Sequence, residues 1–140
     1  MPGASPPSRG RGERLAVSAA RTVLIVEDEA FIALDLMVRL RASGFRVAGV
    51  LARGEDAADR VLRERPDIVL MDVHLAGEIS GIEAVRRIRA SSSVPVIFMS
   101  GYAQDAAIFE NAAFARPCLK LNKPIEFVDL LEAIETAMAG

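Results

Sequence analysis

Aromatic and cysteine side chains are scarce in this sequence. Its 140 residues include no tryptophan, one tyrosine, six phenylalanines and a single cysteine, Cys118. One thiol cannot close an internal disulfide, so the fold requires no oxidising compartment, and an isolated cysteine is usually a small core residue. Because 51% of the residues are hydrophobic, we expect one domain with a core of alanine, valine, isoleucine and leucine.

Long apolar runs are absent as well. No run approaches the roughly 20 residues that cross a bilayer, and the first twenty residues lack the continuous apolar stretch of a secretory signal. We therefore expect a cytoplasmic protein with no membrane insertion. The chain also lacks an excess of basic charge, since its formal net charge is −2. A nucleic-acid surface normally shows clustered lysine and arginine, so direct DNA binding is not expected.

The start of the chain differs in composition from the rest. Residues 2–12 consist of Pro, Gly, Ser, Ala and Arg, which offer too little apolar surface to offset the entropy of ordering. We interpret residues 1–20 as a disordered tail and residues 21–140 as the folded domain. An electrostatic tether to a polyanion or a membrane is the alternative, but three arginines are few for that purpose.

Short apolar runs alternate with longer helical patterns from residue 22 onward. The predicted strands are Thr22–Val26, Phe45–Val50, Ile68–Met71, Val94–Met99 and Cys118–Leu121. The predicted helices are Ala30–Ala42, Glu55–Glu64, Ile82–Arg89, Ala103–Ala113 and Glu126–Met138. This alternation implies right-handed crossovers and a parallel sheet with helices on both faces. Five such units predict an α/β, flavodoxin-like (βα)5 three-layer sandwich with sheet order 2-1-3-4-5, in which ligands bind at the carboxyl ends of the strands.

Polar residues follow directly after four of these strands. Glu27 and Asp28 follow the first, Asp72 the third, Ser100 the fourth, and Lys123 lies just beyond the fifth. Each residue alone could serve as a helix cap, but capping does not explain this combination at one sheet edge. Converging carboxylates suit Mg²⁺, which needs only one or two of them. We expect Asp28 and Asp72 to be direct ligands and Glu27 to act through water.

Phosphoryl transfer is the chemistry that uses every member of this set. Asp72 can act as the nucleophile, because aspartyl phosphates are established covalent intermediates, and the transfer mainly requires positioning and charge neutralisation. Mg²⁺ and the ammonium of Lys123 would neutralise the phosphoryl oxygens, while the Ser100 hydroxyl donates to one of them.

The chain from Arg21 to Met138 resembles a CheY-like response-regulator receiver domain. The resemblance rests on Leu-Ile-Val-Glu-Asp-Glu at 24–29, on Asp72, on Ser100 and on Lys123-Pro124. It implies a two-component phosphorelay protein that takes a phosphoryl group from a sensor histidine kinase or a histidine phosphotransfer protein. Such a module is not an enzyme, because it catalyses only its own phosphorylation and dephosphorylation. The backbone carbonyl of His74 would complete the metal shell, with the imidazole ring facing solvent.

Residues 98–102 point to a subgroup and to a mode of output. Phe98-Met99-Ser100-Gly101-Tyr102 resembles the Phe-x-Thr/Ser-Gly-aromatic signature of a group with many stand-alone receivers. No residues follow the fifth predicted helix for an output domain, so we expect signalling through an unknown downstream protein target. The family also docks its phosphodonor over the acceptor beside the first helix, which carries more apolar residues than one buried stripe needs.

Two departures from the family pattern bear on the mechanism. The loop Leu75–Gly81 is one residue longer than in the commonest receivers, and Lys120 stands where a switching Tyr or Phe is usual. A lysine ammonium resists burial, so we hypothesise that phosphorylation repositions the Ser100–Tyr102 loop and that Lys120 supplies a charged contact. The alternative is that Tyr102 is a static packing residue and Lys120 a solubilising edge charge.

Three other functions compete with a phosphoacceptor. A haloacid-dehalogenase type of enzyme needs a second aspartate two residues after the nucleophile, where this chain has His74. A flavodoxin-like FMN carrier needs a hydroxyl-rich phosphate loop after the first strand, where Glu27, Asp28 and Glu29 would repel phosphate. An unphosphorylated interaction module is disfavoured because the acceptor, metal and lysine positions are all filled.

Overall fold

Strands and helices alternate along the part of the chain that the structure describes. The computed structural model describes residues 20–102, 105 and 118–139. The strands are β1 (Thr22–Val26), β2 (Arg46–Leu51), β3 (Ile68–Asp72), β4 (Val96–Ser100) and β5 (Cys118–Asn122). The helices are α2 (Ala30–Ala42), the short 3-10 helix η1 (Gly54–Asp56), α3 (Ala57–Glu64), α4 (Gly81–Arg89) and α6 (Phe127–Ala139).

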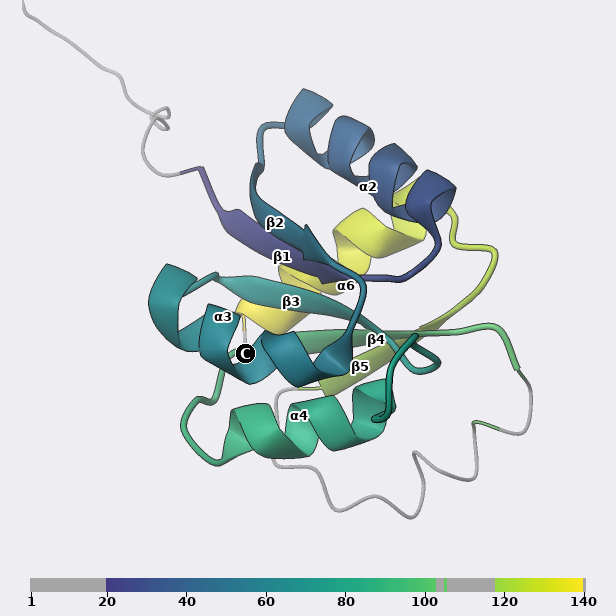
Figure 1. Cartoon of the computed structure of the whole chain (residues 1–140). Helices are drawn as coiled ribbons and strands as arrows, with labels where there is room; N and C mark the ends of the chain where they lie inside the picture. The colour runs from purple at the N-terminus through teal and green to yellow at the C-terminus, as the bar shows by residue number, and fades with distance from the viewer. Residues whose placement is uncertain (1–19, 103–104, 106–117, 140) are drawn as a thin grey trace, which may run out of the picture.

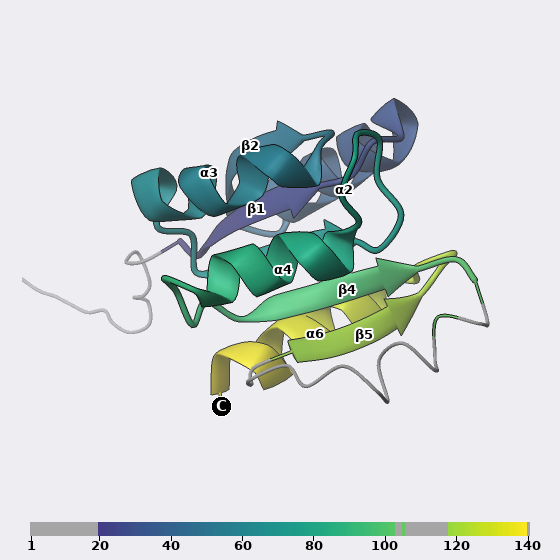
Figure 2. The same ribbon diagram turned by 60° about the horizontal axis from the view of Figure 1, so that its bottom comes forward.

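The five strands form one parallel sheet in the order β2-β1-β3-β4-β5. This order confirms the flavodoxin-like fold, because β1 lies between β2 and β3 and the chain therefore reverses its direction of travel across the sheet after β2. Figure 2 shows β5 at the sheet edge beside β4. Register aligns the strand ends, with Val26 opposite Met71, Asp72 opposite Met99 and Ser100 opposite Asn122. The carboxyl ends of β1, β3, β4 and β5 thus share one edge.

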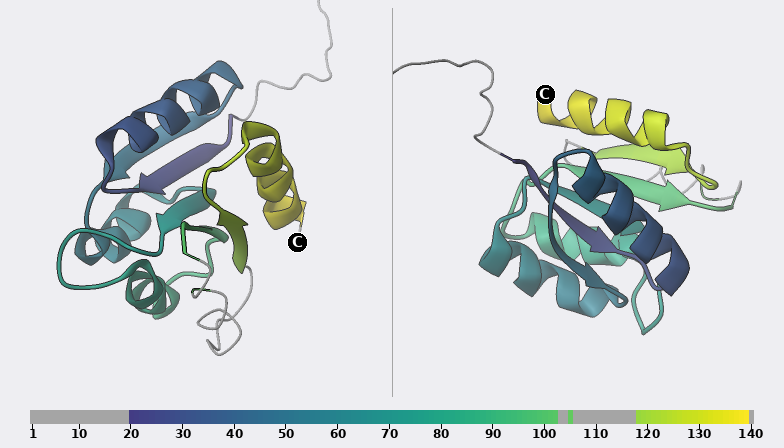
Figure 3. Two further views of the ribbon diagram at one scale, coloured as in Figure 1. Left: turned by 90° about the vertical axis from the view of Figure 1, so that its right-hand side faces the viewer. Right: turned by 90° about the horizontal axis from the view of Figure 1, so that it is seen from above.

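Helices cover both faces of the sheet, giving three layers. Helices α2 and α6 lie on one face, and α3 and α4 lie on the other (Figures 1 and 3). Alternate residues of each strand point to opposite faces, so Leu24 and Met71 pack under α3 and α4, while Ile25 and Leu70 pack under α2 and α6. All four are fully buried. The wholly apolar strands seen in the sequence result from burial on both faces.

β1 and α2 have the bounds that the sequence predicts, and the other described elements differ from their predicted bounds by one or two residues. Local backbone chemistry explains three of these differences. Pro95 has no N–H, so the ladder of β4 begins at Val96. The N–H of Phe45 donates to the Leu40 carbonyl at 3.0 Å and closes α2, so β2 begins one residue later. The N–H of Asp56 bonds to the Arg53 carbonyl three residues back at 3.3 Å, which makes the start of the third helical segment a 3-10 turn.

Helix α4 begins with a side-chain N-cap. The Ser80 hydroxyl accepts a hydrogen bond from the Glu83 N–H at 3.2 Å. The Glu83 carboxylate lies 3.4 Å from both Arg86 and Arg87. Ser80 therefore caps the helix without the return bond from Glu83 to the Ser80 N–H that would complete a capping box.

Two sequence predictions lie outside the described residues. They are the disordered tail predicted over residues 1–20, of which the structure describes only residue 20, and the helix predicted for Ala103–Ala113, of which it describes only residue 105. None of the described helices is long and apolar enough to span a membrane.

Candidate functional site

Three carboxylates converge at the carboxyl edge of the sheet. Oxygen atoms of Glu27, Asp28 and Asp72 all lie within 4.8 Å of one another. Glu27 and Asp72 are buried, whereas Asp28 is exposed. The first two residues follow β1 and the third ends β3, and these strands are neighbours in the sheet. The topology therefore brings together the acidic residues that the sequence singled out.

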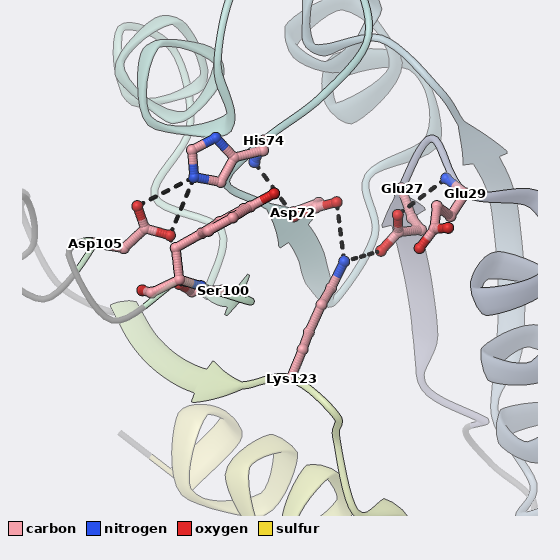
Figure 4. Close-up of polar contacts among 8 residues, drawn as sticks. Glu27, Glu29, Asp72, His74, Ser100, Asp105 and Lys123 are labelled. Atoms are coloured by element: carbon pink, nitrogen blue, oxygen red, sulfur yellow. Dashed lines mark hydrogen bonds and ion pairs between the residues drawn. The ribbon is translucent and has the colours of Figure 1, made fainter.

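Lys123 joins this cluster from the end of β5. Its ammonium donates to Glu27 Oε1 at 2.9 Å and to Asp72 Oδ2 at 3.1 Å (Figure 4). The side chain is only 20% exposed, so both ion pairs are shielded from solvent and are stronger than surface pairs. Lys123 is 96 residues from Glu27 in the sequence, and only the parallel sheet makes them neighbours.

The electrostatics of the cluster follow from burial and from these ion pairs. Burial is the largest influence on Glu27 and raises the pKa of its carboxyl, although hydrogen bonds from Lys123 and from the Glu29 N–H offset part of the rise. For Lys123, burial alone would lower the pKa, but the hydrogen bonds to Glu27 and Asp72 outweigh it and raise the pKa of the lysine. The lysine is therefore held as a cation beside the Asp72 carboxylate.

The donor set fits a hard divalent cation such as Mg²⁺. Both Glu27 oxygens already accept hydrogen bonds, one from Lys123 and one from the Glu29 N–H at 3.0 Å. Asp28 stands exposed beside them. One lysine balances only one of the three carboxylates, so excess negative charge remains for a cation, and carboxylate oxygens are the ligands that Mg²⁺ prefers. Direct ligation by Asp28 and Asp72, with Glu27 acting through water, stays a prediction, because both Asp72 oxygens also accept hydrogen bonds, from Lys123 and from the His74 N–H.

Ser100 lies at the same edge, but its hydroxyl is turned to a partner that the sequence did not reveal. Ser100 Oγ lies 2.5 Å from Asp105 Oδ2 and 3.2 Å from the Tyr102 carbonyl oxygen. Asp105 is 1% exposed. Asp105 lies in the alanine-rich stretch for which the sequence predicts a helix. The signal that could have identified it is a carboxylate five residues after Ser100 at the start of an alanine-rich stretch.

The imidazole of His74 contacts two side chains beyond the acidic cluster. Nε2 lies 3.1 Å and 3.2 Å from the two Asp105 oxygens, and the ring meets Tyr102 edge-on with centroids 4.6 Å apart. The His74 side chain is 53% exposed, so the ring does reach solvent as expected. It also forms part of a hydrogen-bonded group with Ser100 and Asp105, which sequence reasoning missed. The His74 N–H lies 3.3 Å from Asp72 Oδ1.

The two proposed switch residues occupy different surroundings. Tyr102 is 54% exposed, and its ring meets the His74 ring edge-on. Lys120 is half-buried in β5 opposite Phe98, while Leu119 and Leu121 pack into the core beneath α2 and α6, as strand alternation predicts. The helix that would face Lys120 lies outside the described residues.

The long loop after β3 is fixed to η1 by a hydrogen bond to Glu55. Glu55 Oε2 accepts hydrogen bonds from the Glu78 N–H and from Arg53, both at 2.9 Å. The bond from Glu78 holds the pKa of the Glu55 carboxyl below its ordinary value. Gly77 has φ +96°, and a Cβ there would lie 2.8 Å from the Glu55 carboxylate, so glycine allows the close approach.

Comparison with known proteins gives consistent matches. The model of the response regulator receiver domain family matches residues 23–135. The transcriptional regulatory protein PdtaR of Mycobacterium tuberculosis is 34% identical over 119 residues, covering 85% of this chain and 57% of PdtaR. The phyllosphere-induced regulator PhyR of Methylorubrum extorquens is 33% identical over 129 residues, covering 91% of this chain and 47% of PhyR. The chain thus spans about half the length of these relatives.

A solved structure of the same kind superposes closely. The signal receiver domain of a modulated diguanylate cyclase from Desulfovibrio desulfuricans G20 is 35% identical and superposes with a TM-score of 0.77, covering 86% of this chain and 95% of that one.

Proposed function

Since this chain belongs to the response regulator receiver domain family of two-component signalling proteins, we propose that it accepts a phosphoryl group on Asp72. The donor is a sensor histidine kinase or a histidine phosphotransfer protein, and the output is a phosphorylation-dependent contact with a downstream protein. One observation carries the proposal. Lys123 bridges Asp72 and Glu27 inside the carboxylate cluster, which places a cation and a metal-binding pocket beside one carboxylate.

The transfer follows from the positions of these groups. An Asp72 oxygen attacks phosphorus while the bond from phosphorus to the donor imidazole breaks, and the electron pair leaves with that nitrogen. Lys123 remains next to the acceptor and neutralises charge on the phosphoryl oxygens. Asp28, Asp72 and the His74 carbonyl would hold Mg²⁺, with Glu27 acting through water, and the metal would supply further neutralisation when bound. Ser100 would donate its hydroxyl proton to a phosphoryl oxygen.

An apolar face beside the acceptor supports a protein donor. Phe31 on α2 is 88% exposed. It borders a hollow of about 300 Å³ that Ile32, Leu36, Ile125 and Lys123 also line. A donor domain seated on this face would bring its histidine to the side of Lys123, where the acceptor lies. Exposed aromatic side chains are typical anchors of protein interfaces.

Signalling after transfer is proposed to leave through the surface near Ser100. Tyr102 and Lys120 are the candidate switch residues, because one follows Ser100 by two residues and the other replaces the usual aromatic. Their role rests on these positions and on the contact between Tyr102 and the His74 ring.

The proposal is tested by labelling with acetyl phosphate and Mg²⁺. We expect the intact protein to gain the mass of one phosphoryl group, and Asp72→Asn to gain none, because Asp72 is the carboxylate of the cluster that both pairs with Lys123 and lies on the strand next to Ser100. Asp59→Asn, an exposed aspartate on α3, is the matched control and should label like wild type. Labelling of Asp72→Asn at wild-type yield would show that the acceptor is another residue.

A further inference from the structure

A fourth carboxylate, Asp105, lies on the opposite side of Asp72 from Glu27 (Figure 4). Asp105 is 1% exposed and contacts both the Ser100 hydroxyl and the His74 ring. Figure 4 shows Asp72 between two groups, with Lys123 and Glu27 on one side and Ser100, His74 and Asp105 on the other. Both partners of Asp105 adjoin the acceptor, because Ser100 ends the strand next to β3 and His74 follows Asp72 by two residues.

The Ser100 hydroxyl has one proton to donate. In this structure the proton is directed to Asp105, at 2.5 Å, or to the Tyr102 carbonyl oxygen, at 3.2 Å. A hydroxyl that donates to a carboxylate forms a hydrogen bond of the stronger, charge-assisted kind. Ser100 cannot donate to a phosphoryl oxygen and to Asp105 at the same time, so the two acceptors exclude each other.

From this geometry, and resting on the proposed function, we propose that Asp105 is a positioning residue that competes with the Asp72 phosphoryl group for the Ser100 hydroxyl. Before phosphorylation Asp105 holds the hydroxyl away from the acceptor. After phosphorylation the hydroxyl turns to the phosphoryl oxygen and its bond to Asp105 is broken. Part of the free energy gained at the phosphoryl group is therefore spent on breaking that bond.

His74 makes this exchange possible. A buried carboxylate that loses its only hydrogen-bond partner is strongly destabilised. Asp105 has a second partner, since His74 Nε2 lies 3.1 Å and 3.2 Å from its two oxygens, and the ring nitrogen donates when it carries the proton. Asp105 thus keeps one hydrogen bond when Ser100 turns away.

The test is a double-mutant cycle on beryllofluoride binding, measured by calorimetry with saturating Mg²⁺. Beryllofluoride stands in for the phosphoryl group on Asp72. We expect Asp105→Asn to bind it about tenfold more tightly than wild type, which corresponds to about 1.4 kcal/mol, because a neutral amide competes less well for the hydroxyl. In a Ser100→Ala background the same substitution should change the dissociation constant less than about twofold, since no hydroxyl remains to be shared.

The Ser100→Ala arm also separates the proposal from a simple charge effect. Removing a negative charge near an anion site would tighten binding in both backgrounds equally, and that result would overturn the proposal. Unchanged or weaker binding in folded Asp105→Asn would overturn it as well. Asp67→Asn is the matched control, because that aspartate accepts a 2.7 Å hydrogen bond from the Thr22 N–H at the opposite end of β1. The Asp67→Asn variant should bind beryllofluoride with the wild-type affinity.

A second variant keeps the proposal testable if Asp105→Asn does not fold. His74→Ala removes the other partner of Asp105, so turning Ser100 away leaves the carboxylate with no side-chain partner among the described residues. We expect weaker beryllofluoride binding in this variant and no such loss when Ser100→Ala is added. An equal loss in both backgrounds would contradict the mechanism. A wild-type protein that binds no beryllofluoride would instead refute the proposed function, which is a distinguishable outcome.

Discussion

Single side chains at the sheet edge differ in how much of their hydrogen-bonding capacity is already used. Glu27 accepts from Lys123 and from the Glu29 N–H, and Asp72 accepts from Lys123 and from the His74 N–H. Asp28 is the exposed member of the cluster. The three carboxylates have the same charge, but Glu27 and Asp72 accept hydrogen bonds within the site, whereas Asp28 faces solvent. The exposed one should therefore contribute most directly to metal affinity.

We predict that Asp28→Asn raises the Mg²⁺ dissociation constant at least about tenfold, since even the loss of an outer partner of a metal ligand has effects of that size. The substitution removes ligand charge but leaves Asp72 and Lys123 in place. Metal titration followed by calorimetry gives the constant. Glu29→Gln is the control, because Glu29 is also exposed and acidic but lies outside the cluster. An unchanged constant for Asp28→Asn would place the metal elsewhere.

Helix α2 shows how one element can serve both the core and a surface. Leu36 and Leu40 on one side are buried against the sheet. Phe31, Leu34 and Val38 are 88%, 51% and 56% exposed. A surface helix normally carries polar residues on its outer face. Donor recognition is therefore proposed to depend on this exposed apolar surface of α2, and above all on Phe31, which borders the hollow that Lys123 also lines.

Phe31→Ala should slow phosphoryl transfer from a histidine-containing donor protein about tenfold, as expected for an exposed aromatic anchor. Labelling by acetyl phosphate should stay at the wild-type rate, because the small donor does not need the helix face. Both rates are measured on the same preparation. Leu62→Ala on α3, which is also exposed, serves as the control for a loss of apolar surface. Equal slowing with both donors would indicate damage to the fold or to the acceptor.

The whole molecule depends on a sheet that is buried on both faces. Residues of β1, β3 and β4 divide between two apolar clusters, one beneath α3 and α4 and one beneath α2 and α6. Loss of packing in either cluster therefore weakens the attachment of helices to the sheet that positions Asp72. Stability and the geometry of the site are linked through the central strand β3.

At this scale we predict that Leu70→Ala, in the middle of β3 and fully buried, lowers the free energy of unfolding by about 2–5 kcal/mol. The loss combines lost burial with the cavity left behind. Urea unfolding followed by circular dichroism measures it. Leu62→Ala, 53% exposed, should cost much less. Similar losses for the two variants would mean that Leu70 does not lie in a closely packed core.

The sequence by itself determined the fold and which charged residues meet at the carboxyl edge of the sheet. Apolar runs such as Thr22–Val26 indicate strands buried on both faces, and their alternation with helical patterns restricts the connections to right-handed crossovers. The observed strand order confirms that prediction. Carboxyl ends of parallel strands share one edge, so position in the sequence was enough to bring Glu27, Asp28, Asp72 and Lys123 together. Their roles in transfer stay predictions.

Only the tertiary structure decided which side chains are partners. Asp105 lies in alanine-rich sequence, and nothing in that pattern shows that its carboxylate is buried against Ser100 and His74. Likewise, Glu55 is one of two acidic residues just before α3, yet it is the one that accepts a hydrogen bond from the Glu78 N–H. The physical reason is the short range of a hydrogen bond. Periodicity determines which face of an element a residue occupies, whereas a hydrogen bond depends on differences of a few tenths of an ångström between segments far apart in the chain.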